Sequence, residues 1–194
     1  MATLSPNSIV GVIGSAGALK GYKALLEALP ANMGMAYVIV SHMSPTAYSH
    51  LANILSRHTK MPTIKASSEM PIRKNHVYVI PPNADLFIDS FTFKVVSPRA
   101  RRSNQGDLFL SSLAEVIGER AVGIILSGYG SDGTEGCRHI QARGGTTFAQ
   151  DVSAEVGAMP LSAQASGNVN FVLPPEQMPS ELKRLARNAK GRKM

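Results

Sequence analysis

Three polar residues along the chain could together cleave an ester or an amide. Each of them follows a short apolar segment of strand length. They are Ser15, His42 and Asp132. A histidine titrates near neutral pH and can accept the proton of a serine hydroxyl, while a carboxylate can orient the imidazole and stabilise its charged form. Since the carboxyl ends of parallel strands lie along one edge of a sheet, we expect these three side chains to meet there as a Ser-His-Asp triad.

Ser15 lies in a glycine-rich turn that is compatible with a second kind of site. Gly14 and Gly17 flank it, and a helical spacing of leucines begins after Ala18, so the turn leads from a strand into a helix. A phosphate-binding loop uses the same glycines and the same free N–H groups at a helix start. The spacing matches neither G-x-G-x-x-G nor G-x-x-x-x-G-K-[ST], and Ile13 breaks a strict G-x-S-x-G turn. The turn alone therefore leaves a nucleophile and a phosphate site both open.

Apolar, strand-like runs alternate with amphipathic helical segments along most of the chain. The patterns predict strands at 9–14, 35–41, 63–66, 77–80, 86–88, 91–95, 121–126, 146–149 and 170–173, and helices at 18–29, 48–58, 106–117, 138–143, 158–164 and from 174 onward. The runs at 86–88 and 91–95 are close enough to form a β-hairpin. We therefore expect an α/β fold, a doubly wound, mostly parallel sheet with helices on both faces and an antiparallel hairpin insertion.

The composition is typical of a globular protein with one domain. The 194 residues are 44% hydrophobic and 17% charged, and no apolar run approaches the roughly 18 residues of a membrane span. The start of the chain lacks the basic and apolar regions of a signal peptide, and the single cysteine, Cys137, cannot form an internal disulfide. These features predict a cytoplasmic protein without membrane insertion, in which Cys137 is a packing residue. No histidines have the spacing of a metal motif, so neither a metal nor another cofactor is expected.

The net charge of +7 is concentrated at the C-terminal end. Residues 183–194 contain six of the 20 basic residues and no acidic one, and the other 14 nearly balance the 13 acidic residues. We therefore expect a domain at 1–185 followed by a basic tail or linker at 186–194, and no nucleic-acid binding. A second basic cluster, formed by Arg99, Arg101 and Arg102, could attract an acidic surface or be an ordinary solvated loop.

Several motifs, taken together and in this order, resemble the CheB-type chemotaxis-receptor methylesterase domain. They are IGSAG at 13–17, VSHM at 40–43, HVYVIPPN at 76–83, LSGYGSDG at 126–133, FAQD at 148–151 and GAMP at 157–160. The similarity covers about residues 8 to 185. It is greatest to the branch in which this domain is fused to a receptor methyltransferase.

The resemblance implies a serine hydrolase that removes methyl groups from glutamate methyl esters of chemotaxis receptors and releases methanol. Members of the family can also deamidate receptor glutamines. By the family's motifs, Ser15 corresponds to the nucleophile, His42 to the general base and acid, and Asp132 to the orienting carboxylate.

The resemblance also implies an oxyanion hole and a set of partners. The family's oxyanion position falls at Tyr129, where methionine is usual, and we expect Ala16, Tyr129 and Gly130 to line the oxyanion hole and substrate cleft. The implied partners are the methylated cytoplasmic region of chemoreceptors and a methyltransferase domain or separate regulator. Because only about seven residues precede the first strand, we expect no receiver domain in this chain. The alternative, from a different class, is a non-catalytic receptor- or phosphate-binding α/β module that uses the same edge.

Overall fold

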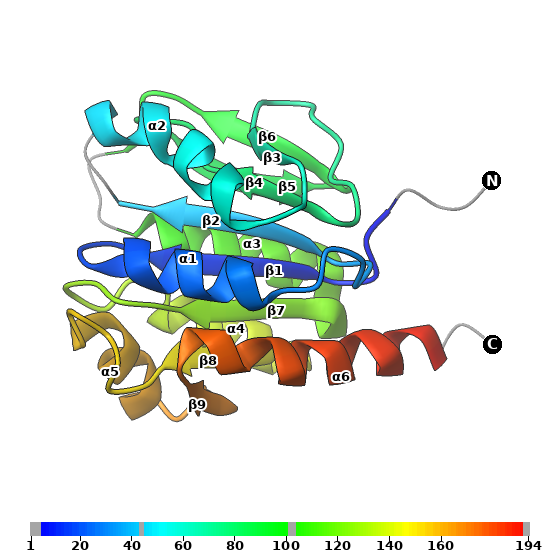
Figure 1. Ribbon diagram of the computed structural model, residues 1–194, viewed down its shortest axis with the longest axis vertical. Coiled ribbons are helices and arrows are strands. Elements are labelled where there is room, and N and C mark those ends of the chain that lie inside the picture. Colours follow the sequence, from blue (N-terminus) through cyan, green and yellow to red (C-terminus); the bar gives the residue numbers. More distant parts are fainter. Residues whose placement is uncertain (1–4, 43–44, 101–103, 192–194) are drawn as a thin grey trace.

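The computed structural model describes residues 5–42, 45–100 and 104–191, and it is built around a seven-stranded parallel sheet (Figure 1). In spatial order the strands are β3 (Thr63–Lys65), β4 (His76–Val79), β2 (Ala36–Ser41), β1 (Ile9–Gly14), β7 (Ala121–Ile125), β8 (Thr146–Gln150) and β9 (Phe171–Leu173). Each pairs with its neighbours in parallel. Two further strands, β5 (Asp85–Asp89) and β6 (Thr92–Val96), form a separate antiparallel hairpin. The predicted fold class is confirmed, including the hairpin insertion.

Helices cover both faces of the sheet (Figure 1). One face packs against α1 (Ala18–Ala28), α2 (Pro45–Leu55) and α6 (Met178–Gly191), and the other packs against α3 (Gln105–Ile117), α4 (Thr134–Ala142), α5 (Ala158–Ala165) and the hairpin. Three short 3-10 turns complete the described elements: η1 (Ser56–His58), η2 (Gly118–Arg120) and η3 (Pro175–Gln177). Burial on both faces explains why the central strands are nearly continuous apolar runs.

The central strand β1 contributes to both hydrophobic cores. Its β-branched side chains alternate, so that Ile9 and Ile13 enter the core under α3 while Val10 and Val12 enter the core under α1. All four side chains are fully buried. This alternation holds β1 in one register, because a shift by one residue would exchange the two sets.

Helix α3 packs directly on the sheet, because β1 has a glycine at the point of contact. A Cβ at Gly11 would come within 2.6 Å of Leu110 Cδ2, and one at Gly136 in α4 would come within 2.5 Å of Leu110 Cβ. Leu110 is therefore wedged between β1 and α4, and it is fully buried. This packing fixes the start of α3 relative to the ends of β1 and β7.

Two predicted helices begin earlier than their sequence patterns indicated. The helix expected at 48–58 begins at Pro45, where the fixed φ of proline suits a first helical turn, and its last three residues form η1. The helix expected at 138–143 begins at Thr134, directly after Gly133, whose φ is 89°. The glycine-rich run at 127–136 resembles a loop in sequence, but its last residues already form the first turn of α4.

The C-terminal helix α6 continues to Gly191, so the expected domain limit at 185 falls inside a helix. Leu182 and Ala186 are buried on its inner side, which explains why the helix continues beyond 185. The role of 186–194 as a tail or linker stays a prediction. In the second basic cluster, the Arg99 N–H donates to the carbonyl of Asn83, whereas residues 101–103 lie outside the described residues.

Cys137 lies in α4 and is fully buried. Burial raises the pKa of its thiol to about 12, with a further contribution from the charge of Asp107, so the thiol is protonated at neutral pH. These surroundings are those of a packing residue. In the described part of the chain, no helix combines the length and apolar character needed to cross a membrane.

We expect Leu110→Ala to lower the free energy of unfolding by about 2–5 kcal/mol, because it leaves a cavity where α3, α4 and β1 meet. Urea denaturation measures this change. A matched control is Leu161→Ala on α5, where the side chain is 60% exposed and the expected change is within about 0.5 kcal/mol. Equal losses in the two variants would contradict the role given to Leu110.

Candidate active site

The three residues predicted to form a triad follow three adjacent strands at the centre of the sheet. Ser15 follows β1, His42 follows β2, and Asp132 lies in the loop between β7 and α4. From β1 the chain first builds β2 and its neighbours on one side and then β7, β8 and β9 on the other. The site therefore lies at the point where the strand order reverses, at the carboxyl edge that is on the left in Figure 1. In doubly wound folds this is the usual place for a ligand.

His42 and Asp132 are in direct contact. The distance from His42 Nε2 to Asp132 Oδ2 is 2.6 Å, and the two side chains are 12% and 3% exposed. By distance this is an ion pair, although its angles depart from those of an aligned hydrogen bond, and Nε2 has no other partner among the described residues. The contact uses Nε2, so Nδ1 is the ring nitrogen that remains for a serine hydroxyl.

The Asp132 carboxylate is held by three backbone N–H groups. Oδ2 accepts from Gly106 N at 2.7 Å, and Oδ1 accepts from Asp107 N and Gly133 N, each at 2.9 Å. Two of these donors lie in the first turn of α3, where N–H groups lack partners within the helix and the helix dipole favours a negative charge. The free-energy cost of burying this carboxylate is thus offset by backbone donors on one side and by the imidazole of His42 on the other.

Asp107, in the first turn of α3, makes a similar contact with the start of α4. Asp107 Oδ1 accepts from the N–H of Gly136 at 2.9 Å. Burial, together with the neighbouring Asp132 charge, raises the pKa of Asp107 to about 6, although the Gly136 N–H acts in the opposite direction. Asp107 therefore changes its charge in the pH range in which a histidine also titrates.

The turn that carries Ser15 is fixed by Ser127, which follows β7. The Ser15 N–H donates to the Ser127 carbonyl at 2.9 Å, and Ser127 Oγ donates to the carbonyl of Ala16 at 2.8 Å. The same hydroxyl accepts from Val156 N at 2.9 Å, and the Ser127 N–H donates to Gln150 Oε1 at 3.0 Å. One buried serine thereby ties the nucleophile turn to the ends of two neighbouring strands.

Several N–H groups near Ser15 remain available for a ligand. The N–H of Ser15 is already bonded, but those of Ala16, Tyr129 and Gly130 donate no hydrogen bond within the described residues. The Tyr129 side chain is 72% exposed, so this position contributes to the site mainly through its backbone. Ser15 Oγ likewise makes no hydrogen bond to another described residue. Contacts of this kind are often absent without substrate.

The sequence pattern did not indicate the residues that hold Asp132 and Ser15 in place. In the sequence, Asp107 is an acidic residue at a helix start that suits the helix dipole or could face a substrate, and Ser127 is part of a glycine-rich loop. Gly106 is required for another reason, since a Cβ there would lie 2.4 Å from Ile13 Cγ2 and 2.8 Å from Asp132 Oδ2. These roles depend on contacts between residues far apart in sequence.

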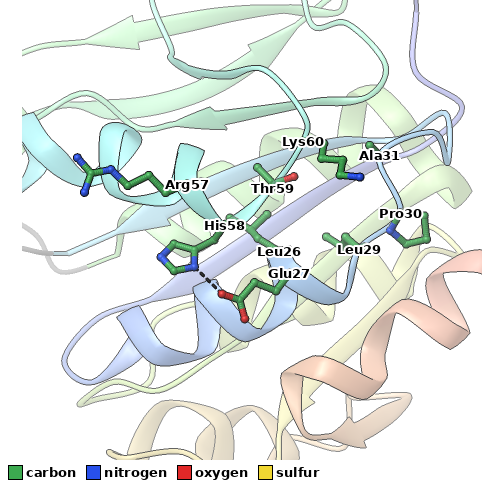
Figure 2. A pocket seen from close by; sticks show the side chains of 9 residues that line it. All are labelled: Leu26, Glu27, Leu29, Pro30, Ala31, Arg57, His58, Thr59 and Lys60. Atoms are coloured by element: carbon green, nitrogen blue, oxygen red, sulfur yellow. Dashed lines mark hydrogen bonds and ion pairs between the residues drawn. The ribbon is translucent and has the colours of Figure 1, made fainter.

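A pocket of about 460 Å³ lies away from this edge, between the C-terminal part of α1 and residues 57–60. Figure 2 shows its lining, in which His58 Nδ1 contacts Glu27 Oε1 while the Arg57 side chain is directed away from that pair. Ser15 lies at the opposite end of α1. The polar groups of this pocket do not converge on a common point, so the strand edge is the better candidate for chemistry.

Asp107→Asn is expected to change how stability depends on pH. In the folded chain the pKa of Asp107 is raised from an ordinary value near 4 to about 6, so the folded state binds this proton more tightly and the stabilisation that results is lost as pH rises from about 4 to about 6. Asparagine does not titrate. The stability of the variant relative to the native chain should therefore rise over this range, by roughly 1 kcal/mol after allowance for partial solvent screening. Urea denaturation at pH 4.5 and 7.5 measures the difference, and parallel pH dependences would contradict the placement of Asp107.

Comparisons with known proteins agree with this arrangement. A relative from Leptospira interrogans is 32% identical over 185 residues, which are 93% of this chain and 94% of that protein. The protein-glutamate methylesterase/protein-glutamine glutaminase of the group 3 operon of Rhizobium meliloti is 30% identical over 187 residues. That match covers 94% of this chain and 53% of the relative, so the chain spans about half the length of the Rhizobium protein.

A solved structure has the same fold over nearly the whole chain. It is the crystal structure of the Thermotoga maritima CheB methylesterase catalytic domain, with a TM-score of 0.84 and 26% sequence identity over 92% of this chain and 98% of that one. The family model for the CheB methylesterase matches residues 10–182. This stretch contains every element from β1 to the start of α6, and the chain belongs to the CheB methylesterase family.

Proposed function

We propose that this chain is a protein-glutamate methylesterase that hydrolyses glutamate methyl esters by means of Ser15, His42 and Asp132. The observation that carries the proposal is the 2.6 Å contact between His42 and a buried Asp132, beside a serine on a tight turn at the same strand edge. Membership of the CheB methylesterase family supports the reaction class. The name of the Rhizobium relative also supports a glutaminase activity, in which an amide takes the place of the ester.

The first half of the proposed reaction forms an acyl-enzyme. His42 Nδ1 accepts the proton of Ser15 Oγ as that oxygen attacks the ester carbonyl. The Asp132 carboxylate, in contact with Nε2, stabilises the imidazolium that results. When the tetrahedral intermediate collapses, the proton on Nδ1 passes to the departing methoxide, and methanol leaves.

The second half regenerates the enzyme. A water molecule gives a proton to His42 Nδ1 and attacks the acyl carbonyl, and collapse of this second intermediate returns the proton to Ser15 Oγ. The product is a free glutamate carboxyl group. A glutamine side chain would follow the same steps with ammonia as the leaving group.

Backbone amides are proposed to hold the negative charge that develops on the carbonyl oxygen. The N–H groups of Ala16, Tyr129 and Gly130 are the candidates, because they lack partners within the described residues. The N–H of Ser15 is excluded by its bond to the Ser127 carbonyl. Fixed donors of this kind stabilise the transition state without the reorganisation that water would need.

The substrate and the biological setting follow from the family. We infer that the ester lies on the methylated cytoplasmic region of a chemoreceptor and that the protein acts in the cytoplasm without a metal or another cofactor. The similarity of the motifs to the methyltransferase-fused branch supports a methyltransferase domain or a separate regulator as a partner. The catalytic unit would then be 1–185, with 186–194 as a basic tail or linker.

We expect Ser15→Ala to reduce methanol release from membranes carrying methyl-labelled chemoreceptors by at least about 1000-fold, because the nucleophile is removed. The matched control is Ser56→Ala, an exposed serine on η1 whose hydroxyl donates to a local carbonyl, and this variant should keep native activity. A serine-directed phosphonate probe should label the native chain and the control but not Ser15→Ala.

Equal methanol release by the native chain and Ser15→Ala would contradict Ser15 as the nucleophile. Absence of release by the native chain, from receptors that another CheB methylesterase demethylates, would contradict the methylesterase assignment. Receptor binding that survives Ser15→Ala, without turnover by either protein, would favour the non-catalytic binding module.

A further inference from the structure

The N-termini of α3 and α4, beside the candidate active site, are linked by hydrogen bonds to two carboxylates. Asp132, which precedes α4, accepts from the Gly106 and Asp107 N–H groups of α3. Asp107, in the first turn of α3, accepts from the Gly136 N–H of α4 at 2.9 Å. Each helix thus supplies an acceptor for the unpaired N–H groups of the other.

This exchange leaves little room for Asp132 to move. The Gly106 Cα lies so close that an added Cβ would be 2.8 Å from Asp132 Oδ2, and Gly136 packs against Leu110 in the same way. Upstream of Asp132 the loop is held at Gly128, whose N–H donates to the Val156 carbonyl and whose carbonyl accepts from the Met159 N–H, each at 2.9 Å. The Asp107–Gly136 bond anchors the downstream side, four residues after Asp132.

We propose that Asp107 is a positioning residue for the hydrolase reaction, acting by fixing the start of α4 and hence the orientation in which Asp132 meets His42. The proposal rests on the function proposed above for Ser15, His42 and Asp132. It assigns to Asp107 no contact with the substrate. Loss of the Asp107 side chain should therefore lower kcat rather than raise KM.

The charge of Asp107 also acts on the same pair. Among the described residues, Asp107 interacts electrostatically with the Asp132 carboxylate and the Cys137 thiol, and the thiol is neutral at ordinary pH because its pKa is raised to about 12. An ionised Asp107 therefore adds a second negative charge beside Asp132. The loss of this charge has to be separated from the loss of the hydrogen bond to the Gly136 N–H.

Two substitutions separate the contribution of the Asp107 hydrogen bond from that of its charge. In Asp107→Asn the amide oxygen can still accept from Gly136 N–H, and the amide hydrogens can donate to Asp132, so the geometry is kept while the charge is removed. In Asp107→Ala both the acceptor and the charge are lost. Glu135→Gln is the matched control, because Glu135 is an exposed acidic residue in the first turn of α4 and forms ion pairs with Arg138 and His139.

The experiment combines the kinetics of methyl ester hydrolysis with the NMR chemical shifts of the His42 imidazole, measured in the full chain at one pH. For Asp107→Ala we expect kcat to fall about 10- to 100-fold with little change in KM, since a small displacement of a catalytic group has an effect of this size. For Asp107→Asn, which keeps an acceptor for the Gly136 N–H, we expect most of kcat to be retained, and the His42 signals should move less than in Asp107→Ala. Glu135→Gln should leave both properties unchanged.

Native kcat and native His42 signals in Asp107→Ala would overturn the proposal. Changes as large in Glu135→Gln would also overturn it, because the effect would then be one of net charge alone. If Asp107→Ala does not fold, Asp107→Glu takes its place, since it keeps the charge but displaces the carboxylate, and it should lower kcat in the same way. The NMR measurement needs no substrate, so changed His42 signals in a chain without esterase activity would contradict the proposed function while supporting the placement of Asp107 beside the His42–Asp132 pair.

Discussion

The burial of one negative charge, the carboxylate of Asp132, is the constraint on which the arrangement of this protein depends. A carboxylate on a side chain that is only 3% exposed is costly unless every oxygen has a partner, and here three backbone N–H groups and one imidazole supply them. Two of the donors come from the first turn of α3. The helix must therefore start directly above the end of the sheet, which fixes where its whole length lies.

The close packing of α3 follows from this requirement. Gly106 lets the helix start approach Ile13 and Asp132, and Gly11 lets Leu110 settle onto β1. A Cβ at Gly106 would collide with both Ile13 and Asp132, and one at Gly11 would collide with Leu110, so either substitution would force these neighbours to shift. The hydrophobic core and the polar site are thus not independent parts of the fold, because the same helix supplies apolar contacts to one and N–H groups to the other.

The parts of the candidate site differ in how completely they are formed. The His42–Asp132 contact is present in the chain as it stands, and Ser127 fixes the backbone of the nucleophile turn. Ser15 Oγ, by contrast, has no hydrogen bond to another described residue. The proposed base and carboxylate are therefore already in contact, whereas the hydroxyl of the proposed nucleophile can still rotate between staggered positions.

The sequence by itself determined the α/β class, the central strands and the residue types with the chemistry of a hydrolase. These features are local, since β-branched runs and glycine turns have periods and spacings that can be read along the chain. It did not determine that α4 begins at Thr134 or that α6 continues to Gly191, because helix limits depend on tertiary packing. The tertiary structure alone decided that Asp107, Gly106 and Ser127 hold the site, since each acts on residues more than 20 positions away and no local pattern records such a contact.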